Sequence, residues 1–429
     1  MKIVLDLHLH SRYSRACSPQ LTLEGIDSAC RVKGVGVVAT GDFTYPAWFS
    51  ALKNELTEIA CPTRLTASHG GRGQSGLYKL KNSADDKIKF LLSTELSLIY
   101  KAGGKARRIH LVVHAPNLSA VAELNEFLDK HYNIRSDGRP ILGMSAPDLV
   151  KLCLKIHPEF LIYPAHIWTP WFSVFGSKSG FDSLEECFGD ETGNIYAYET
   201  GLSSDPEMNW RVSALDKLTL LSNSDAHSPA NIAREANVFE LGEFSYAEIY
   251  NIIKSKQSEK ILYTIEFYPE EGMYHFDGHR DCGFSCEPAE ALKLKGICPK
   301  CGRPLTIGVA NRVEELADNP AGRRPEGASD FKKLVELDKI IAECLNIKSR
   351  QSKQVQAEYH KLIKALGSEL YILIDAPLDK IKTASNGRVA EAIKRVRAGE
   401  LIIRPGYDGR YGEVRIFADN EKEVQKSLF

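Results

Sequence analysis

The chain has 429 residues, which suits a large catalytic domain with one or two smaller ones. Hydrophobic residues make up 43% and charged residues 26%, which predicts a packed globular protein and excludes a disordered one. The net charge of −1 excludes a uniformly basic nucleic-acid binder, so DNA binding would require locally concentrated basic residues. No signal-peptide pattern or long apolar span occurs, and most cysteines outside one cluster are scattered, so we expect a cytoplasmic, nucleoid-associated protein.

Residues 1–264 alternate between short apolar strands and amphipathic helices, a pattern that predicts βα units closing into a barrel of parallel strands. The expected strands are Lys2–His8, Val35–Thr40, Ile88–Thr94, Ile109–Val113, Phe160–Tyr163, Asn194–Tyr198 and Leu218–Leu221. The expected helices include Thr22–Arg31, Ser119–His131, Ala146–Lys155 and Ser183–Phe188. Ser145 is positioned to cap the third of these helices. The glycine-rich segment His69–Lys81 interrupts the rhythm and is expected to be an inserted loop.

The character of the chain changes near Glu270. A stretch rich in cysteine and glycine comes first, and the patterns after it predict helices over Phe331–Cys344, Lys353–Leu366 and Arg388–Arg397, with a strand around Tyr371. Asp408-Gly409 lies between alternating apolar runs and predicts a closing hairpin over Leu401–Phe417. We therefore expect an α/β protein in three parts: a barrel over residues 1–268, a zinc ribbon over 269–310 and a mixed α/β domain over 311–429.

Histidines and carboxylates follow the expected barrel strands one after another. They are His8, His10, Asp42, Glu95, His110, His114, His166, Glu199, Asp225 and His227. Because the carboxyl ends of barrel strands meet at one rim, these side chains are expected to lie together. Imidazole and carboxylate are ligands of divalent zinc, manganese and iron, so the cluster predicts a site for two or three ions, with Glu95 or Asp225 as a bridge. Isolated structural residues are the alternative, and they explain the matching positions poorly.

The order of DLHLHS, TGD, the isolated Glu95, a later His166 and SDAH resembles the successive motifs of the PHP (polymerase and histidinol phosphatase) superfamily. The resemblance implies a distorted (βα)7 barrel with a multinuclear metal centre that hydrolyses phosphoesters. It also implies three metal positions. The first would be held by His8, His10, Glu95 and Asp225, and the second by Glu95, His110 and His166. The third would be held by Asp42 and His227. His110 is favoured over His114 as the ligand.

Two departures from the superfamily pattern concern the third metal. Many members carry another histidine shortly after His10 and one near Asp42, whereas residues 14–16 are Ser-Arg-Ala here. The third position is therefore expected to be weak, or to be completed by Glu199. Clustered divalent ions lower the pKa of a bound water and neutralise phosphoryl charge, and Asp225 or Glu199 is expected to orient that water.

Four cysteines form a tight cluster in the middle of the chain, with the spacing C-x3-C, eleven residues, C-x2-C. Two such pairs fit a tetrahedral structural zinc bound by Cys282, Cys286, Cys298 and Cys301. Four unrelated thiols are the alternative. His275 and His279 precede the cluster and could contribute, although packing or surface roles are favoured for them.

The segments PAHIWTPWFSVFGSKSGFDSLEECFGD, GICPKCGRPLTIGVANRVEELAD and GYDGRYGEVRIF resemble the endonuclease Q family. This resemblance implies cleavage of DNA 5′ to deaminated bases (uracil, hypoxanthine, xanthine) and abasic sites, supported by Mg²⁺ or Mn²⁺, with Zn²⁺ in the ribbon and also expected in the barrel. Basic stretches over Lys293–Arg324 and Lys380–Arg415 suit a phosphate backbone. Trp168, Trp171 and Phe172 could border a pocket for an extruded base, with core packing as the alternative.

Two other functions remain open from the sequence. A small-molecule phosphatase of the histidinol-phosphate kind would leave the ribbon and the tail unexplained, and a non-catalytic DNA-binding scaffold would not need the near-complete ligand set. The final residues contain Gln425, Leu428 and Phe429 in QKSLF, which resembles the short motifs by which repair enzymes dock on sliding clamps. A frayed terminus is the alternative.

Overall fold

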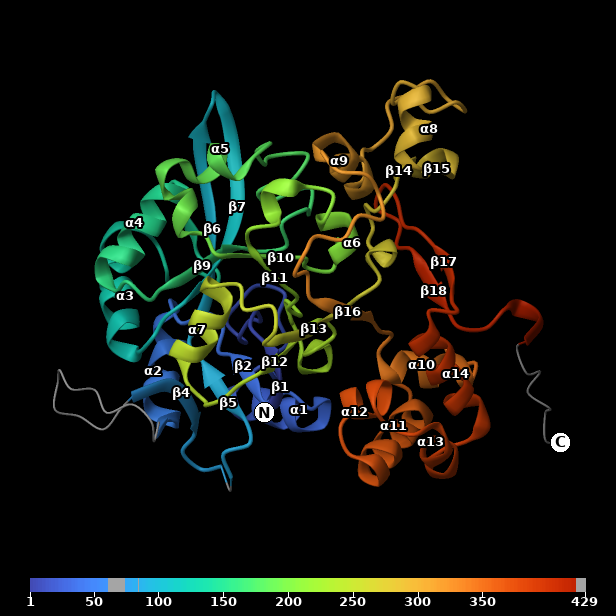
Figure 1. Cartoon of the computed structure of the whole chain (residues 1–429), viewed down its shortest axis with the longest axis horizontal. Coiled ribbons are helices and arrows are strands. Elements are labelled where there is room, and N and C mark those ends of the chain that lie inside the picture. The colour runs from blue at the N-terminus through green and yellow to red at the C-terminus, as the bar shows by residue number, and fades with distance from the viewer. Residues whose placement is uncertain (61–73, 84, 422–429) are drawn as a thin grey trace.

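The computed structural model describes residues 1–60, 74–83 and 85–421. Figure 1 shows a large α/β body, a small cysteine-rich module that projects from one end of it, and a C-terminal helical domain. Within the described residues, no helix is long and apolar enough to cross a membrane.

The body is built on a closed ring of strands. The ring is formed by β1 (Lys2–Asp6), β2 (Val37–Ala39), β5 (Lys89–Leu91), β6 (Ser93–Ala102), β7 (Lys105–His114), β9 (Leu161–Pro164), β10 (Ala197–Glu199) and β11 (Thr219–Leu221). β1, β2 and β5 pair in parallel, as do β10 and β11, while β9 lies beside β10. A bridge between Leu9 and Ala226, just after β1 and β11, closes the ring. The expected α/β barrel is therefore confirmed.

One strand departs from the expected parallel arrangement. β7 is antiparallel to both of its neighbours, β6 and β9. Only Gly103 and Gly104 separate β6 from β7, and both have positive φ values, 57° and 73°. Such a two-residue turn forms a tight hairpin, which reverses the chain where a helix would have kept it parallel.

Helices cover the outside of the ring. They are α1 (Leu23–Lys33), α2 (Pro46–Glu55), α3 (Leu118–His131), α4 (Ala146–Ile156), α5 (Leu184–Phe188), α6 (Pro206–Asn209) and α7 (Tyr246–Lys254). Ser145 caps α4 as predicted, since its hydroxyl accepts the N–H of Asp148. Outside the ring, the sheet is extended by β3 (Leu56–Ala60), β4 (Gln74–Leu80), β12 (Ala236–Glu240), β13 (Ile261–Glu266) and β16 (Asp330–Lys333), and β8 (Ile141–Leu142) pairs with β6.

The cysteine-rich module contains β14 (Asp277–His279), β15 (Phe284–Cys286) and α8 (Pro288–Lys293), and α9 (Val309–Leu316) follows it. The C-terminal domain contains α10 (Leu337–Cys344), α11 (Lys353–Leu366), α12 (Glu369–Ile374), α13 (Leu378–Ala384), α14 (Gly387–Ala398) and the hairpin of β17 (Ile402–Arg404) and β18 (Glu413–Arg415). A buried ion pair of 2.7 Å between Lys33 and Glu369 joins α1 to α12.

Three local predictions are corrected by the structure. The segment around Tyr371 is helix α12 and not a strand, because Ser368 caps it, and a short apolar run cannot by itself distinguish the two states. The helix expected from Phe331 begins at Leu337, since Asp330–Lys333 pairs with β13 as strand β16. The loop expected over His69–Lys81 lies outside the described residues up to residue 73, and its remainder forms strand β4.

The pairing of β16 with the barrel sheet also affects the three-part division. The boundary expected at residue 311 precedes a segment that returns to the barrel. The division into residues 1–268, 269–310 and 311–429 stays a proposal, with the helical domain itself beginning at α10.

Candidate metal centre

Three overlapping groups of donor side chains lie at the rim of the barrel. The groups are His8, His10 and Glu95; His10, Asp225 and His227; and Glu95, His110 and His166. Within each group the donor atoms lie no more than 4.8 Å apart, so each group could hold one ion. Glu95 belongs to two groups, which makes it a natural bridging ligand. The structure thus brings together the residues expected for the first and second metals.

The donor atoms fit a divalent cation. The Nε2 atoms of His8 and His10 and the Oδ1 atom of Asp225 are buried and make no hydrogen bond among the described residues. Asp225 Oδ1 lies 3.1 Å from His10 Nε2 and 3.9 Å from His8 Nε2. An unsatisfied buried polar atom costs roughly 1–3 kcal/mol, so three of them around one point are expected only where a further group completes them.

The carboxylates at the centre stabilise positive charge. Burial alone would lower the pKa values of His8 and His10, but the neighbouring carboxylates outweigh it and raise both. Burial would raise the pKa of Glu95, yet His110 and Arg139 hold it well below its usual range. Burial lowers the pKa of His110 to about 4. His110 is therefore neutral near pH 7, which is the form in which imidazole binds a metal.

Asp42, which the sequence predicts as a ligand of the third metal, lies outside the three donor groups, and its ligand role stays a prediction. Its Oδ2 accepts hydrogen bonds from the Ser11 N–H (2.7 Å) and from the hydroxyls of Ser11 (2.6 Å) and Ser14 (2.8 Å). Its Oδ1 lies 3.1 Å from His10 Nδ1. Both oxygens are occupied, so Asp42 orients His10 and leaves Nε2 for the metal. Ser14 thereby supports Asp42 through its hydroxyl. The third donor group consists of His10, Asp225 and His227.

Glu199 contacts His8 in the same way, and its expected role in orienting the attacking water stays a prediction. Its carboxylate lies 3.0 Å from His8 Nδ1 and accepts hydrogen bonds from the His166 N–H (3.0 Å) and the Asn223 side chain (2.9 Å). The side chain is fully buried. With both oxygens engaged, Glu199 fixes the ring of His8.

Arg139 also lies at the centre, although the sequence did not point to it. Its Nη1 donates to Glu95 Oε2 at 2.9 Å, and its side chain is 25% exposed. It therefore brings a fixed positive charge to the bridging carboxylate, with part of the guanidinium still accessible. Arg139 precedes the short strand β8 and does not follow a barrel strand, so the pattern that located the other residues could not locate it.

The backbone at the centre is strained. Asp42, His166, Phe172 and Asp225 have φ values of 48°, 29°, 60° and 45°, in the left-handed region that residues other than glycine rarely adopt. Each such residue costs on the order of 1–3 kcal/mol, and such strain concentrates at functional sites. The clustering of four such residues here supports the assignment of the site.

The other predicted residues, one histidine and three aromatic side chains, have different surroundings. His114 lies 3.0 Å from the Tyr163 hydroxyl, outside the donor groups, and burial lowers its pKa to about 3. Trp168 is only 1% exposed and donates to Asn209, so it packs in the core of this structure. The ring of Phe172 lies 4.7 Å from that of His110, so Phe172 can contact a ligand near the centre, whereas Trp171 is 40% exposed and packs edge-on against Tyr274.

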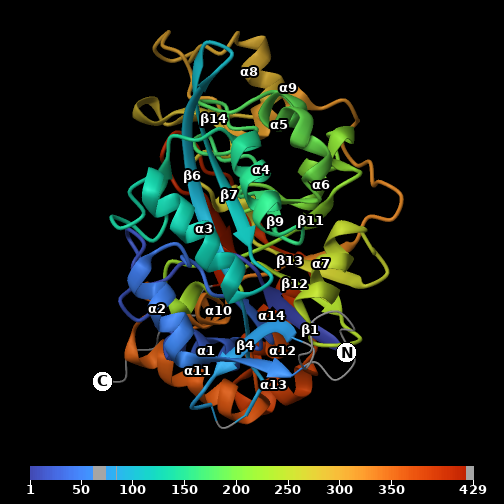
Figure 2. The same cartoon turned by 90° about the vertical axis from the view of Figure 1, so that its left-hand side faces the viewer.

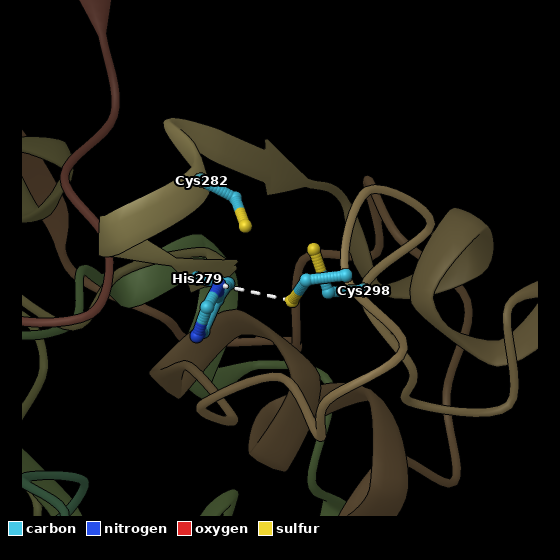
Figure 3. Close-up of side chains that lie close together, drawn as sticks. His279, Cys282 and Cys298 are labelled. Atoms are coloured by element: carbon cyan, nitrogen blue, oxygen red, sulfur yellow. Dashed lines mark hydrogen bonds between the residues drawn. The ribbon is translucent and has the colours of Figure 1, made fainter.

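A second, separate donor group lies in the cysteine-rich module. It consists of His279, Cys282, Cys298 and Cys301, whose donor atoms lie within 4.8 Å of one another. Figure 3 shows His279 and Cys282 facing Cys298 across a common centre, and His279 Nδ1 lies 3.6 Å from Cys301 Sγ. We call this group the Cys/His module.

Cys286, the fourth ligand expected from the cysteine spacing, lies outside this donor group, and its role as a zinc ligand stays a prediction. In the β14–β15 hairpin, His279 and Cys282 flank the turn, whereas Cys286 pairs with Asp277 at the opposite end. Cys286 is 4% exposed and packs with Ala291 and Leu305. The spacing of the cysteines does not show where the hairpin turns. The position of the turn decides which side chains lie near Cys298 and Cys301.

Several known proteins resemble this chain. The family model "MJ0043 C-terminal domain" matches residues 336–400. Protein MJ0043 of Methanocaldococcus jannaschii is 34% identical over 251 residues, which make up 58% of this chain but only 31% of MJ0043. Protein YqxK of Bacillus subtilis is 28% identical, with 76% of this chain and 78% of YqxK covered.

A solved structure decides the family. The crystal structure of the lesion-specific endonuclease PfuEndoQ from Pyrococcus furiosus matches with a TM-score of 0.83 and 32% identity, covering 100% of this chain and 98% of that one. The chain belongs to the endonuclease Q family. A structure of endonuclease Q in complex with a 27-mer duplex substrate, which carries an abasic lesion at the active site, matches over 100% of both chains with a TM-score of 0.82 and 33% identity.

Proposed function

We propose that this chain is a metal-dependent endonuclease that hydrolyses DNA on the 5′ side of deaminated bases (uracil, hypoxanthine and xanthine) and of abasic sites. The observation that carries the proposal is the match, over the full length of both chains, to endonuclease Q bound to a duplex with an abasic lesion. The donor groups at the barrel rim supply the catalytic apparatus that such an activity needs.

The side chains have distinct roles in this proposal. Divalent ions bound at the rim would activate a water and neutralise charge on the phosphate. Asp42 and Glu199 hold the rings of His10 and His8 with their Nε2 atoms directed inward. Asp225 is the carboxylate with a free buried oxygen and a partly exposed side chain, so it is suited to orient the attacking water. Arg139 can bind a non-bridging phosphate oxygen from its exposed side.

The metals are assigned by the chemistry of their ligands. Three thiolates and one imidazole in the Cys/His module suit Zn²⁺ in a closed, structural site. The histidine and carboxylate ligands of the barrel suit Zn²⁺ or Mn²⁺, and Mg²⁺ or Mn²⁺ is the proposed support for cleavage.

The test uses end-labelled duplexes that contain a single uracil, hypoxanthine, xanthine or abasic site, together with an undamaged duplex and a phosphomonoester. We expect nicks on the 5′ side of each lesion that leave a 3′-hydroxyl, and no hydrolysis of the other two substrates. Hydrolysis of the phosphomonoester alone would favour a small-molecule phosphatase, and binding without any cleavage would favour a non-catalytic scaffold.

A sliding clamp is the second proposed partner, through Gln425, Leu428 and Phe429, which lie outside the described residues. Two adjacent apolar side chains and a glutamine suit a preformed apolar pocket with a polar edge, and short tails of this kind bind modestly because they must become ordered. Deletion of Gln425–Phe429 should leave nicking of short duplexes unchanged and abolish co-elution with the clamp of the same organism. Co-elution at full affinity would exclude this partner.

A further inference from the structure

The β6–β7 hairpin carries a concentration of positive charge that the metal centre does not use. Lys101, Lys105, Arg107 and Arg108 lie beside its turn, and no Asp or Glu occurs between Glu95 and Glu123. The whole chain has a net charge of −1, so this segment is a local exception. We call residues 101–108 the basic hairpin.

The basic hairpin extends directly from the metal centre. Glu95 lies near the start of β6 and His110 near the end of β7, while Ala102 pairs with Lys105 at the tip. Strands rise about 3.3 Å per residue, so the six steps from Glu95 to Lys101 (101 − 95) place the tip roughly 20 Å from the centre. Figures 1 and 2 both show β6 and β7 rising to the end of the molecule that also carries α8.

Contacts with the loop after β9 hold the hairpin in place. The guanidinium of Arg107 lies 4.1 Å from the centre of the Phe181 ring and donates to the carbonyls of Gly180 and Ala102. The Arg108 N–H donates to the carbonyl of Ser179 at 3.3 Å. The hairpin is therefore a supported projection with a defined direction.

The lysines of the tip remain available to a partner. Lys101 and Lys105 are exposed, and neither forms an ion pair within the described part of the chain. Arg108 is also exposed, and its guanidinium lies 6.0 Å from the ring of Phe172, which borders His110. Positive charge thus continues from the edge of the metal centre to the tip of the hairpin.

We propose that the basic hairpin binds the phosphate backbone of the DNA duplex on one side of the cleavage site, and this rests on the proposed function. Phosphates along one strand are spaced about 3.4 Å apart along the axis, so a tip roughly 20 Å from the metal centre reaches phosphates about six nucleotides from the cut. A narrow ribbon with cations on its edge suits a backbone, whose recognition depends on charge and not on base identity.

The test compares Lys101→Glu/Lys105→Glu with Lys151→Glu/Lys155→Glu, a control that makes the same charge change at two exposed lysines of α4. Dissociation constants are measured before Mg²⁺ is added, on three duplexes that each contain one abasic site. The first duplex has long arms on both sides of the lesion. In each of the other two, a different arm ends about three base pairs from the lesion, well short of the reach of the hairpin tip. Nicking by the wild-type protein is measured on the same duplexes.

The hairpin variant should bind the long duplex about tenfold more weakly and lower the dependence of log Kd on log salt concentration by about two, one for each phosphate contact. This difference in affinity between the hairpin variant and wild type should vanish on one of the two shortened duplexes. The affinity of the control variant should stay within about twofold of wild type, because changes at exposed lysines remote from DNA alter only weak long-range attraction. An equal loss in both variants, a loss that persists on both shortened duplexes, or no loss would overturn the proposal.

The same measurements separate this inference from the proposed function. Wild-type protein that binds every duplex but cuts none would overturn the proposed function, and the hairpin would still be judged by its dissociation constants. Wild-type protein that nicks the lesion duplex, alongside a hairpin variant of unchanged affinity, would overturn the hairpin proposal alone.

Discussion

The barrel metal centre and the Cys/His module both gather metal-binding side chains, but they collect them from very different lengths of chain. The barrel centre draws on residues from His8 to His227, which lie on or beside several strands, whereas the module draws on residues from His279 to Cys301. In the barrel, further carboxylates such as Asp42 and Glu199 orient the ligands. The barrel centre therefore depends on a scaffold that is already folded, while we expect the fold of the module to depend on a bound metal.

The largest effect is expected when the bridging ligand of the barrel is neutralised. Glu95→Gln should reduce nicking by at least about 1,000-fold, because the ions supply several kcal/mol of transition-state stabilisation and Glu95 is shared by two donor groups. Elemental analysis should show loss of barrel metal while the metal of the module is retained. A variant that keeps its full metal content and wild-type rate would remove Glu95 from the centre.

Removing ligands of the Cys/His module should lower the stability of the protein. Cys298→Ser/Cys301→Ser should release one zinc and lower the unfolding temperature, because metal binding at such a site contributes folding energy. Cys286→Ser is the matched control, since Cys286 lies outside the donor group, and it should keep the zinc. Zinc loss in Cys286→Ser together with zinc retention in His279→Ala would restore the set predicted from the cysteine spacing.

An intermediate effect is expected at Asp42. Asp42→Asn should lower metal affinity or the nicking rate by about 10- to 100-fold, because partners that orient a ligand are typically worth this much and a ligand is worth more. Ser14→Ala, which removes one of the donors to Asp42, should have a smaller effect. A loss as large as that of Glu95→Gln would return Asp42 to the ligands of the third position.

The smallest effect concerns the pH dependence of stability and Glu266, which ends β13 and accepts a hydrogen bond from Thr200. Burial raises the pKa of Glu266 from 4.5 to about 8, so the folded protein holds a proton there that the unfolded chain releases. This stabilisation is present at low pH and is lost as pH rises through 4.5 towards 8. In Glu266→Gln, the unfolding free energy should therefore fall less between pH 5 and pH 8, by at least about 1.4 kcal/mol, the value of one pKa unit. Parallel pH profiles in denaturant titrations would contradict the assignment.

The sequence predicted the strand-end residues of the barrel because each follows an apolar strand whose period is visible locally. Glu95 and His166 follow from that rule, whereas His110 lies inside the antiparallel strand β7 and His114 ends it, so the choice of His110 rested on the family resemblance. The roles of Asp42 and Glu199 do not follow from it, because ligand and orienting partner are the same residue types and differ only in which atoms face inward. Arg139 and His279 depend on tertiary approach and hairpin register, which no local pattern records.

Asp225→Asn tests the central claim, that the barrel centre cuts lesion-containing DNA, most directly. Asp225 has a buried oxygen without a hydrogen bond at the meeting point of His8 and His10, and the change removes its charge with little change in shape. Single-turnover nicking of an abasic-site duplex is measured at saturating protein, beside the dissociation constant for the same duplex. We predict that nicking is abolished while DNA affinity stays within a few-fold of wild type, since the basic hairpin is untouched. Nicking at the wild-type rate would contradict the account.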